Sequence, residues 1–208
     1  MRIVSISDTH CQHRKLKMPK GDIIIHAGDI CKEGTEGEVQ AFLRWFSSLN
    51  FTYKIFIAGN HDFFFDGETK KYLAQIIPEN ICYLNDTGII IEGINFWGSP
   101  VTPWLYDGAF NRKRGPNISK HWKLIPSNTD ILITHGPPHG ILDKNRVDYS
   151  AGCKSLRKFV TSIQPRLHIF GHIHESYGQT KIGKTTYMNA CMVNEEEICT
   201  NVPLIYEL

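Results

Sequence analysis

Five short apolar runs in this chain each lead directly into residues that bind metal ions in many proteins. The clearest run, residues 53–58, ends at Gly59 and is followed by Asn60, His61 and Asp62. Such runs are typical of buried β-strands, and parallel strands place the residues that follow them at one edge of a sheet. The candidate ligands at the five exits are Asp8, His10, Asp29, Asn60, His135, His172 and His174. We therefore expect an α/β sheet whose carboxyl edge carries one site assembled from distant parts of the chain.

The chemistry of these candidate ligands favours divalent transition metals. Three carboxylate or amide oxygens and four imidazoles form a mixed set that suits Mn, Fe, Co, Ni or Zn. The set is larger than a four-ligand structural zinc site, but it suits two metal ions about 3.5–4 Å apart that share a bridging carboxylate. Each motif alone has a simpler interpretation, as a helix cap or a turn. The metal interpretation rests on their joint occurrence.

The order and spacing of these motifs resemble those of the calcineurin-like metallophosphoesterases. The shared pieces are Asp8-x-His10, Gly28-Asp29, Gly59-Asn60-His61-Asp62, His135 and Gly171-His172-x-His174. Residues 5–10, 57–61, 102–104, 134–138 and 186–190 are similar to one branch, the metallophosphoesterase-domain-containing (MPPED) brain proteins and their microbial relatives. The resemblance spans nearly the whole chain and implies a single metallophosphoesterase domain over residues 1–208.

The resemblance implies a role for each residue of the site. One metal ion would be held by Asp8, His10, Asp29 and His174, and the other by Asp29, Asn60, His135 and His172, with Asp29 as the bridge. The ions would be two divalent transition metals (Mn, Fe, Zn, Ni or Co), with Mn expected to support activity in vitro. Metal-bound hydroxide would attack phosphorus in line, while His61 would not bind metal but would protonate the leaving oxygen. Asp62 would orient His61 through its ring N–H.

The implied activity is metal-dependent hydrolysis of a small-molecule phosphoester, with phosphodiesters such as cyclic nucleotides as the leading substrates. Some animal members of the branch carry Gly at the position of His172, so the histidine here predicts a complete two-metal site. The alternative enzyme is a phosphomonoesterase acting on nucleotides or phosphoproteins. The alternative outside enzymes is a non-catalytic scaffold that keeps metal for folding or partner binding. His61 favours the enzyme, because a structural metal site has no need of a non-ligand histidine there.

The resemblance also implies a four-layer α/β/β/α sandwich, and the alternation of strand and helix patterns over residues 1–80 supports it independently. Apolar residues at a spacing of three or four predict helices over residues 36–50, 69–77 and 152–164. Short strands over 81–84, 88–92 and 94–98 are interpreted as a meander in the second sheet. Residues 179–182, 185–189 and 203–206 are expected to be closing strands.

Two segments leave alternatives open. Residues 99–122 are expected to form a long loop, and such loops are often functional. The aromatic residues of segment 99–122 either hold a flat group such as a nucleobase over the metals or pin the loop to the core. These residues are Trp104, Tyr106, Phe110 and Trp122. Asn111 and Arg114 in the same segment match the resembling branch and are the expected substrate contacts. The basic segment 11–20, with His13 and Arg14, is either a solvated loop or a rim that positions phosphate.

Charge and composition limit the kinds of partner and the cellular location expected for this chain. The formal net charge of +2 gives no electrostatic argument for nucleic acid or a membrane surface. No apolar run of about 18 residues is present, and Met1 leads straight into a strand, so neither a membrane span nor a secretory signal is expected. The six cysteines form no C-x-x-C pair and are expected to be free thiols in the cytoplasm. The sequence does not indicate an oligomeric state.

Overall fold

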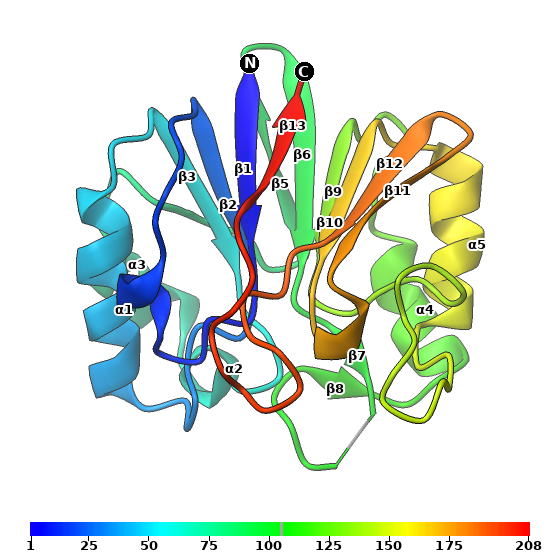
Figure 1. Ribbon diagram of the computed structural model, residues 1–208, viewed down its shortest axis with the longest axis horizontal. Coiled ribbons are helices and arrows are strands. Elements are labelled where there is room, and N and C mark those ends of the chain that lie inside the picture. The colour runs from blue at the N-terminus through cyan, green and yellow to red at the C-terminus, as the bar shows by residue number, and fades with distance from the viewer. Residues whose placement is uncertain (105) are drawn as a thin grey trace.

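The computed structural model describes residues 1–104 and 106–208 as two β-sheets packed face to face with helices outside (Figure 1). The strand order is β13-β1-β2-β3-β4 in the first sheet and β11-β12-β10-β9-β6-β5 in the second. The first sheet comprises β1 (Arg2–Ile6), β2 (Ile23–Ala27), β3 (Tyr53–Ile57), β4 (Cys82–Tyr83) and β13 (Leu204–Glu207). The second comprises β5 (Thr87–Ile91), β6 (Ile94–Ser99), β9 (Ile131–Thr134), β10 (Leu167–Phe170), β11 (Gly178–Ile182) and β12 (Thr185–Asn189). A short parallel pair lies outside both sheets: β7 (Thr102–Pro103) and β8 (Asn111–Arg112).

Alternating side chains along the strands produce the layers, because successive residues of a strand face opposite sides of the sheet. The core between the sheets includes Ile3, Ile25, Ile55, Ile133 and Ile169. Their neighbours face the helices, with Val4, Ile24 and Phe56 on the outer side of the first sheet and Leu132 and Phe170 on that of the second. The predicted four-layer α/β/β/α sandwich is confirmed.

Each outer face is covered by helices. The helices of the first half are α1 (Glu36–Ser48), α2 (Phe63–Gly67) and α3 (Lys70–Ile76), and those of the second half are α4 (Pro116–Trp122) and α5 (Lys154–Ile163). Two 3-10 turns, η1 (His13–Lys15) and η2 (His174–Ser176), follow the ends of β1 and β10. Helix α1 begins at a capping box in which Thr35 and Glu38 satisfy each other's backbone N–H groups, which fixes the start of the helix. The helices predicted over 36–50, 69–77 and 152–164 are confirmed within two residues at each end.

Two expectations about the middle of the chain are wrong. The strand over 81–84 is β4, and it pairs in parallel with β3 in the first sheet rather than joining a meander in the second. A strand that follows β3 through helix α3 returns parallel to it, whereas a short apolar run carries no mark of its sheet. Residues 99–122 are not one loop, because Gly115 and Pro116 start helix α4 there. Seven residues are too few for helical periodicity to appear in the sequence.

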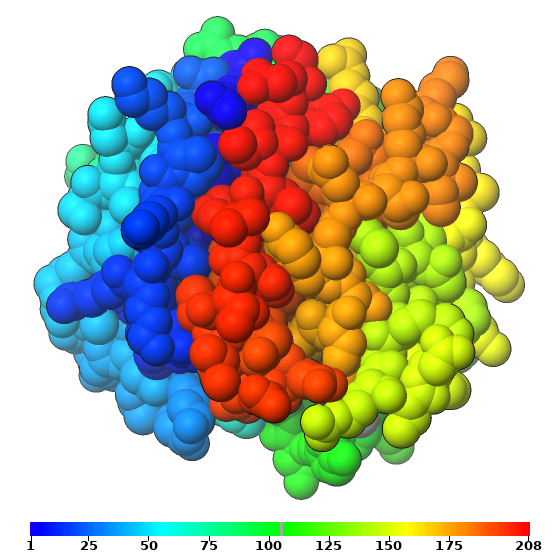
Figure 2. All heavy atoms as spheres, in the orientation of Figure 1, coloured from blue at the N-terminus to red at the C-terminus, as the bar shows by residue number. Residues whose placement is uncertain are grey.

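The parallel strands of both sheets end at the same side of the molecule. A parallel bridge between Ser7 and Cys191 joins the strand ends of the two sheets at this edge. The chain termini lie at the opposite end, where the Met1 amino group donates to the Leu208 carbonyl over 3.3 Å (Figure 1). Figure 2 shows the first and last parts of the chain side by side on one face, where β13 pairs with β1 in the first sheet. The carboxyl edge therefore carries residues from every part of the chain.

Candidate metal centre

All seven candidate ligands come together at the carboxyl edge. Their side chains fall into three groups, in each of which one ligand atom per residue lies within 4.8 Å of the others: Asp8, His174 and Cys191; His10, Asp29 and His61; and Asp29, His135 and His172. Asn60 joins the third group, since its Oδ1 lies 3.0 Å from His135 Nε2. Asp29 belongs to two groups, which is the position that a bridging carboxylate requires.

The surroundings of Asp29 leave several acceptor atoms facing one another. Asp29 Oδ2 lies 3.2 Å from His135 Nε2 and 3.9 Å from His10 Nε2. The other ring nitrogen of each histidine pairs with a backbone carbonyl, His10 Nδ1 with Cys31 over 3.0 Å and His135 Nδ1 with Ala27 over 2.9 Å. A carbonyl only accepts, so each Nδ1 carries a proton and Nε2 is the ring atom that each histidine presents to Asp29. His10 Nε2 is buried without a hydrogen-bond partner.

Such a cluster of acceptors requires a cation, either a proton or a metal ion. Burial lowers the pKa of His135, but the charge of Asp29 and the hydrogen bond to it outweigh burial and raise the pKa to about 10. The pKa of Asp29 is correspondingly lowered against the effect of burial, first by the charge of His135. The residues present therefore fit divalent metal ions, which would take the place of the proton on His135 and would give His10 Nε2 the partner it lacks.

The second half of the site is built on Asp8. Its Oδ1 lies 3.3 Å from His174 Nε2, and its carboxylate accepts the backbone N–H of His172 over 3.0–3.1 Å. Burial alone raises the pKa of Asp8, but the hydrogen bond with His174 and the charges of neighbouring histidines hold it well below its ordinary value. The Cys191 thiol donates to Asp8 Oδ2 over 3.2 Å. Nothing in the sequence singled out Cys191, because a lone cysteine after a strand carries no signal of its own.

Backbone strain is concentrated in the same residues. Asp8, His10, Asp29 and His172 have φ angles of 50°, 39°, 55° and 70°, in the left-handed region that non-glycine residues seldom occupy. Each such residue costs roughly 1–3 kcal/mol and persists only where the surrounding structure imposes it. The fold therefore holds these residues in conformations that bring their side chains into the cluster of candidate ligands.

The His61 side chain lies where it can contact a molecule bound in the cleft, but Asp62 does not orient it. His61 Nδ1 pairs with the Lys32 carbonyl over 2.9 Å, which leaves Nε2 for the cleft. The Asp62 carboxylate instead accepts three backbone N–H groups, from Gly59 at 2.7 Å, Cys31 at 2.9 Å and Ile30 at 3.3 Å. The prediction that Asp62 orients His61 is thus wrong, because Asp62 points back under the turn and holds the loops after β2 and β3 together. Burial and the charge of Asp29 raise the pKa of Asp62 to about 7.

The ligands open into a cleft of about 450 Å³. Besides metal-site residues, it is lined by Phe63, Tyr106, Asp107 and Gly108. Sequence reasoning missed Phe63 and Asp107, although both lie in segments that it examined.

The family of the chain follows from this geometry together with comparisons of known proteins. A model of the calcineurin-like phosphoesterase family matches residues 1–176. The chain belongs to the calcineurin-like phosphoesterase family. It is 41% identical over 232 aligned residues to metallophosphoesterase domain-containing protein 1 of Homo sapiens, an alignment that covers all of this chain and 71% of that protein. It is 37% identical to a UPF0046 protein of Caenorhabditis elegans, over 99% of this chain and 74% of that protein.

The fold of this calcineurin-like phosphoesterase also recurs in solved structures. Phosphopantetheinyl hydrolase of Mycobacterium tuberculosis superposes with a TM-score of 0.60 over 94% of this chain and 90% of that one. The two sequences are 14% identical, so the likeness concerns the fold alone. The predicted resemblance to the calcineurin-like phosphoesterases and to the MPPED branch is confirmed.

Neither of the two expected substrate contacts lies on the described walls of the cleft. The Arg114 guanidinium donates to the carbonyls of Gly152 and Ala151 over 2.9 and 2.7 Å, and it lines a different cavity. Asn111 accepts from Thr102 Oγ1 over 2.8 Å and donates to the Tyr106 carbonyl over 3.2 Å, so it braces the segment that carries Tyr106. Contact of either residue with substrate stays a prediction.

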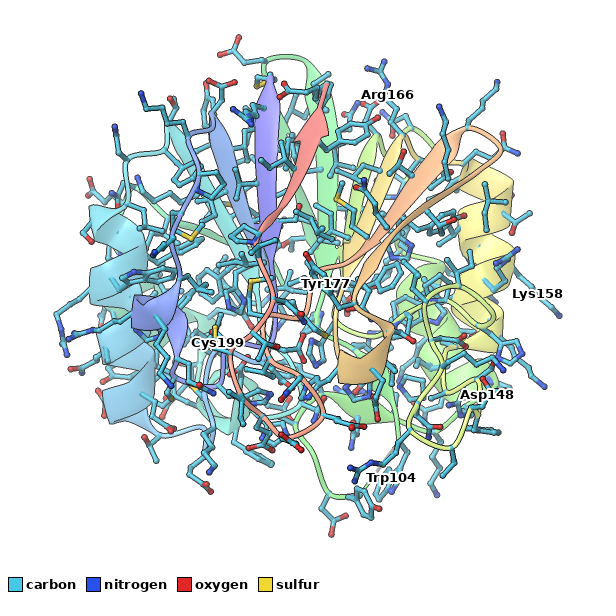
Figure 3. All side chains as sticks on the ribbon, in the orientation of Figure 1. Trp104, Asp148, Lys158, Arg166, Tyr177 and Cys199 are labelled. Atoms are coloured by element: carbon cyan, nitrogen blue, oxygen red, sulfur yellow. The ribbon has the colours of Figure 1, made fainter. Side chains whose placement is uncertain are left out.

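Of the aromatic residues in segment 99–122, some anchor the segment to the core and others are available to a ligand. Phe110 and Trp122 are buried and pin the segment to the core, whereas Trp104 and Tyr106 are exposed. Figure 3 shows Trp104 at the end of the molecule that carries β7 and β8. Tyr106 lines the cleft and is therefore the aromatic residue available to a ligand there. Leu105 of the same segment lies outside the described residues.

The structure also answers the remaining expectations about the basic segment, the cysteines and a membrane span. His13 of the basic segment is buried against Phe42 and Trp45, and burial lowers its pKa to about 4, so it is a neutral core residue and not part of a phosphate rim. Arg14 beside it is exposed. All six cysteines are free. Among the described residues, no helix is both long and apolar enough to span a membrane.

Proposed function

We propose that this calcineurin-like phosphoesterase is a dinuclear phosphodiesterase whose substrates are cyclic nucleotides or similar diesters. The observation that carries the proposal is the Asp29 carboxylate, which faces the Nε2 atoms of two histidines, one from the end of each sheet. One ion would be held by Asp8, His10, Asp29 and His174 and the other by Asp29, Asn60, His135 and His172. Two such ions would lower the pKa of a bound water and neutralise charge on the phosphoryl oxygens.

His61 is the residue that would act on the leaving group. Its Nδ1 pairs with the Lys32 carbonyl, so Nε2 is the ring nitrogen available to a ligand in the cleft. In the protonated ring Nε2 donates to an oxygen that departs from phosphorus, and in the neutral ring it accepts the proton of an entering molecule. Its edge-on contact with His10, with ring centroids 4.8 Å apart, holds the imidazole at the border of the metal site.

The charge of the cleft favours diesters over monoesters. Its described lining contains no lysine or arginine and includes Asp107. A phosphodiester carries one negative charge, which the metal ions balance, whereas a monoester carries close to two at neutral pH. Phe63 and Tyr106 at the rim provide flat apolar surfaces that suit a nucleobase. The volume of about 450 Å³ accommodates a mononucleotide-sized ligand.

The test is hydrolysis of bis(p-nitrophenyl) phosphate against p-nitrophenyl phosphate, with Mn2+ and with chelator. We expect Mn-dependent cleavage that prefers the diester and is lost in Asn60→Ala. The control is Asn117→Ala on the exposed surface of α4, which should leave the rate unchanged. Preference for the monoester would make the protein a phosphatase. Two bound metal ions without cleavage of either compound would favour the non-catalytic scaffold.

A further inference from the structure

A second cavity lies on the outer side of the second sheet, between α4 and α5 and the loop that precedes α5. Its volume is about 730 Å³, larger than that of the metal cleft. Four basic side chains line it: Arg114 before α4, Lys123 after α4, and Lys154 and Lys158 on α5. No carboxylate lines its described walls. In a chain whose net charge is only +2, this gathering of positive charge is a local property of the α4–α5 cavity.

The four cations lack ionic partners. Within the described parts of the chain, none of them forms a salt bridge. Arg114 is held in place by the carbonyls of Ala151 and Gly152, so its position is fixed while its charge remains unbalanced. The Asp143 carboxylate, 3.7 Å from Nδ1 of the cavity residue His139, is buried and accepts the N–H groups of Gly140 and Gly152.

The lysines near the start of α5 are electrostatically unfavourable for the helix. The first turn of α5 contains no acidic residue and begins with Lys154, although a helix start favours negative charge. Lys158 follows one turn later, and Figure 3 shows it on the helical layer outside the second sheet. An anion in the α4–α5 cavity would offset this repulsion. The apolar parts of its wall, Tyr149, Phe159 and Pro116, suit an anion that also carries an organic group.

The α4–α5 cavity is connected to the metal centre by a short rigid segment. His139 lines the cavity and lies four residues after the ligand His135. Between them, a parallel bridge joins Pro138 to Cys153, with hydrogen bonds of 3.2 Å from His139 N to Cys153 O and 2.9 Å from Cys153 N to Pro137 O. The start of α5 is therefore tied to the loop that carries a metal ligand.

We propose that the α4–α5 cavity is a second binding site, for a phosphate-bearing small molecule, that does not depend on metal. The clustered cations recognise the phosphate oxygens, and the aromatic and proline surfaces accept the organic part. The phosphate group belongs either to a distant part of the substrate or to a separate effector, and the chemistry of recognition is the same for both.

The direct test is calorimetric titration of metal-depleted protein with inorganic pyrophosphate and with ADP, in chelator-free buffer at low salt. We expect saturable binding at one site that weakens at least tenfold in Lys154→Glu/Lys158→Glu and falls with added salt. The matched control is Lys181→Glu/Lys184→Glu on and beside β11, which changes the net charge equally but lies outside the cavity. Lys123→Glu on the α4 side is a second, independent variant, and thermal unfolding confirms that each variant is folded.

Absence of saturable binding to the unaltered protein, or an equal loss in the control pair, would overturn the proposal. Neither result depends on hydrolysis, so the proposed activity is judged separately. Kinetics of the metal-loaded enzyme then distinguish the two sources of phosphate. For a substrate group, Lys154→Glu/Lys158→Glu raises KM for a diester that bears a further phosphate and leaves KM for bis(p-nitrophenyl) phosphate unchanged. For an effector, ADP alters kcat for bis(p-nitrophenyl) phosphate, and the variant abolishes that response.

Discussion

Gly28 precedes Asp29, the proposed bridging ligand, and has a φ of +102°, in a region that a residue with a Cβ seldom adopts. A Cβ added at this position would lie 2.5 Å from His135 Nδ1 and 2.7 Å from the Ala58 carbonyl oxygen. Real Cβ atoms do not approach other atoms so closely, so the His135 ring must move. Gly28→Ala therefore perturbs a proposed metal ligand, His135, through the backbone without removing any ligand atom.

The size of the effect has two parts. The strained φ costs roughly 1–3 kcal/mol for any residue other than glycine. Displacement of the ring also breaks the buried hydrogen bond from His135 Nδ1 to the Ala27 carbonyl, at about 1–3 kcal/mol. Gly93→Ala isolates the first part, because Gly93 has a φ of +78° and no atom within 4 Å of an added Cβ. In a chain of this size about 1 kcal/mol corresponds to roughly 2–4 °C in Tm.

The assays are calorimetric unfolding, Mn2+ titration and hydrolysis of bis(p-nitrophenyl) phosphate. Both variants should lose stability, with Gly28→Ala losing more. Only Gly28→Ala should weaken Mn2+ binding, by about 10–100-fold, as expected when the support of a metal ligand is disturbed. Equal Mn2+ affinity in the two variants would refute the reasoning, since it would mean that the His135 ring tolerates the added methyl group.

Three further changes have defined outcomes. His61→Ala should retain both metal ions by titration yet slow diester hydrolysis by about 10²–10⁴-fold, as for loss of a general acid; retained activity would assign the leaving-group role elsewhere. His168 is buried, its pKa is lowered to about 3, and its Nε2 donates to Thr134 Oγ1, whose own proton goes to the Gly136 carbonyl. The folded protein keeps this ring neutral while the unfolded chain takes up a proton near pH 6.5, so its contribution to stability is complete above that pH and is lost as the pH falls towards 3. His168→Gln should flatten the fall in urea midpoint between pH 6.5 and 4, and an unchanged slope would contradict the assignment. Thr35→Ala removes the cap of α1 and should lower the free energy of unfolding by about 1 kcal/mol in urea titration, with no effect on Mn2+ binding.

The residue types at the strand exits carried most of what could be predicted about the site. Asp8, Asp29 and Asn60 stand directly after or close to apolar runs, and parallel strands bring such positions together whatever the details of packing. Their convergence was therefore predictable. The role of Asp62 was not, because adjacency to His61 suggested a hydrogen bond that the turn geometry prevents. Cys191 was not predictable either, since only the bridge to Ser7 brings its thiol to Asp8.

What the sequence by itself determined is the chemistry at the edge of the sheets: strand periodicity and the order of Asp, Asn and His residues are local properties. The tertiary structure decided which atoms of those residues face each other. The carbonyls of Cys31, Ala27 and Lys32 select the ring nitrogens of three histidines, and every residue has a carbonyl, so no pattern of side chains reveals this selection. The α4–α5 cavity likewise unites residues 114–123 with 149–159, which approach only because helices α4 and α5 pack on the same face of the second sheet.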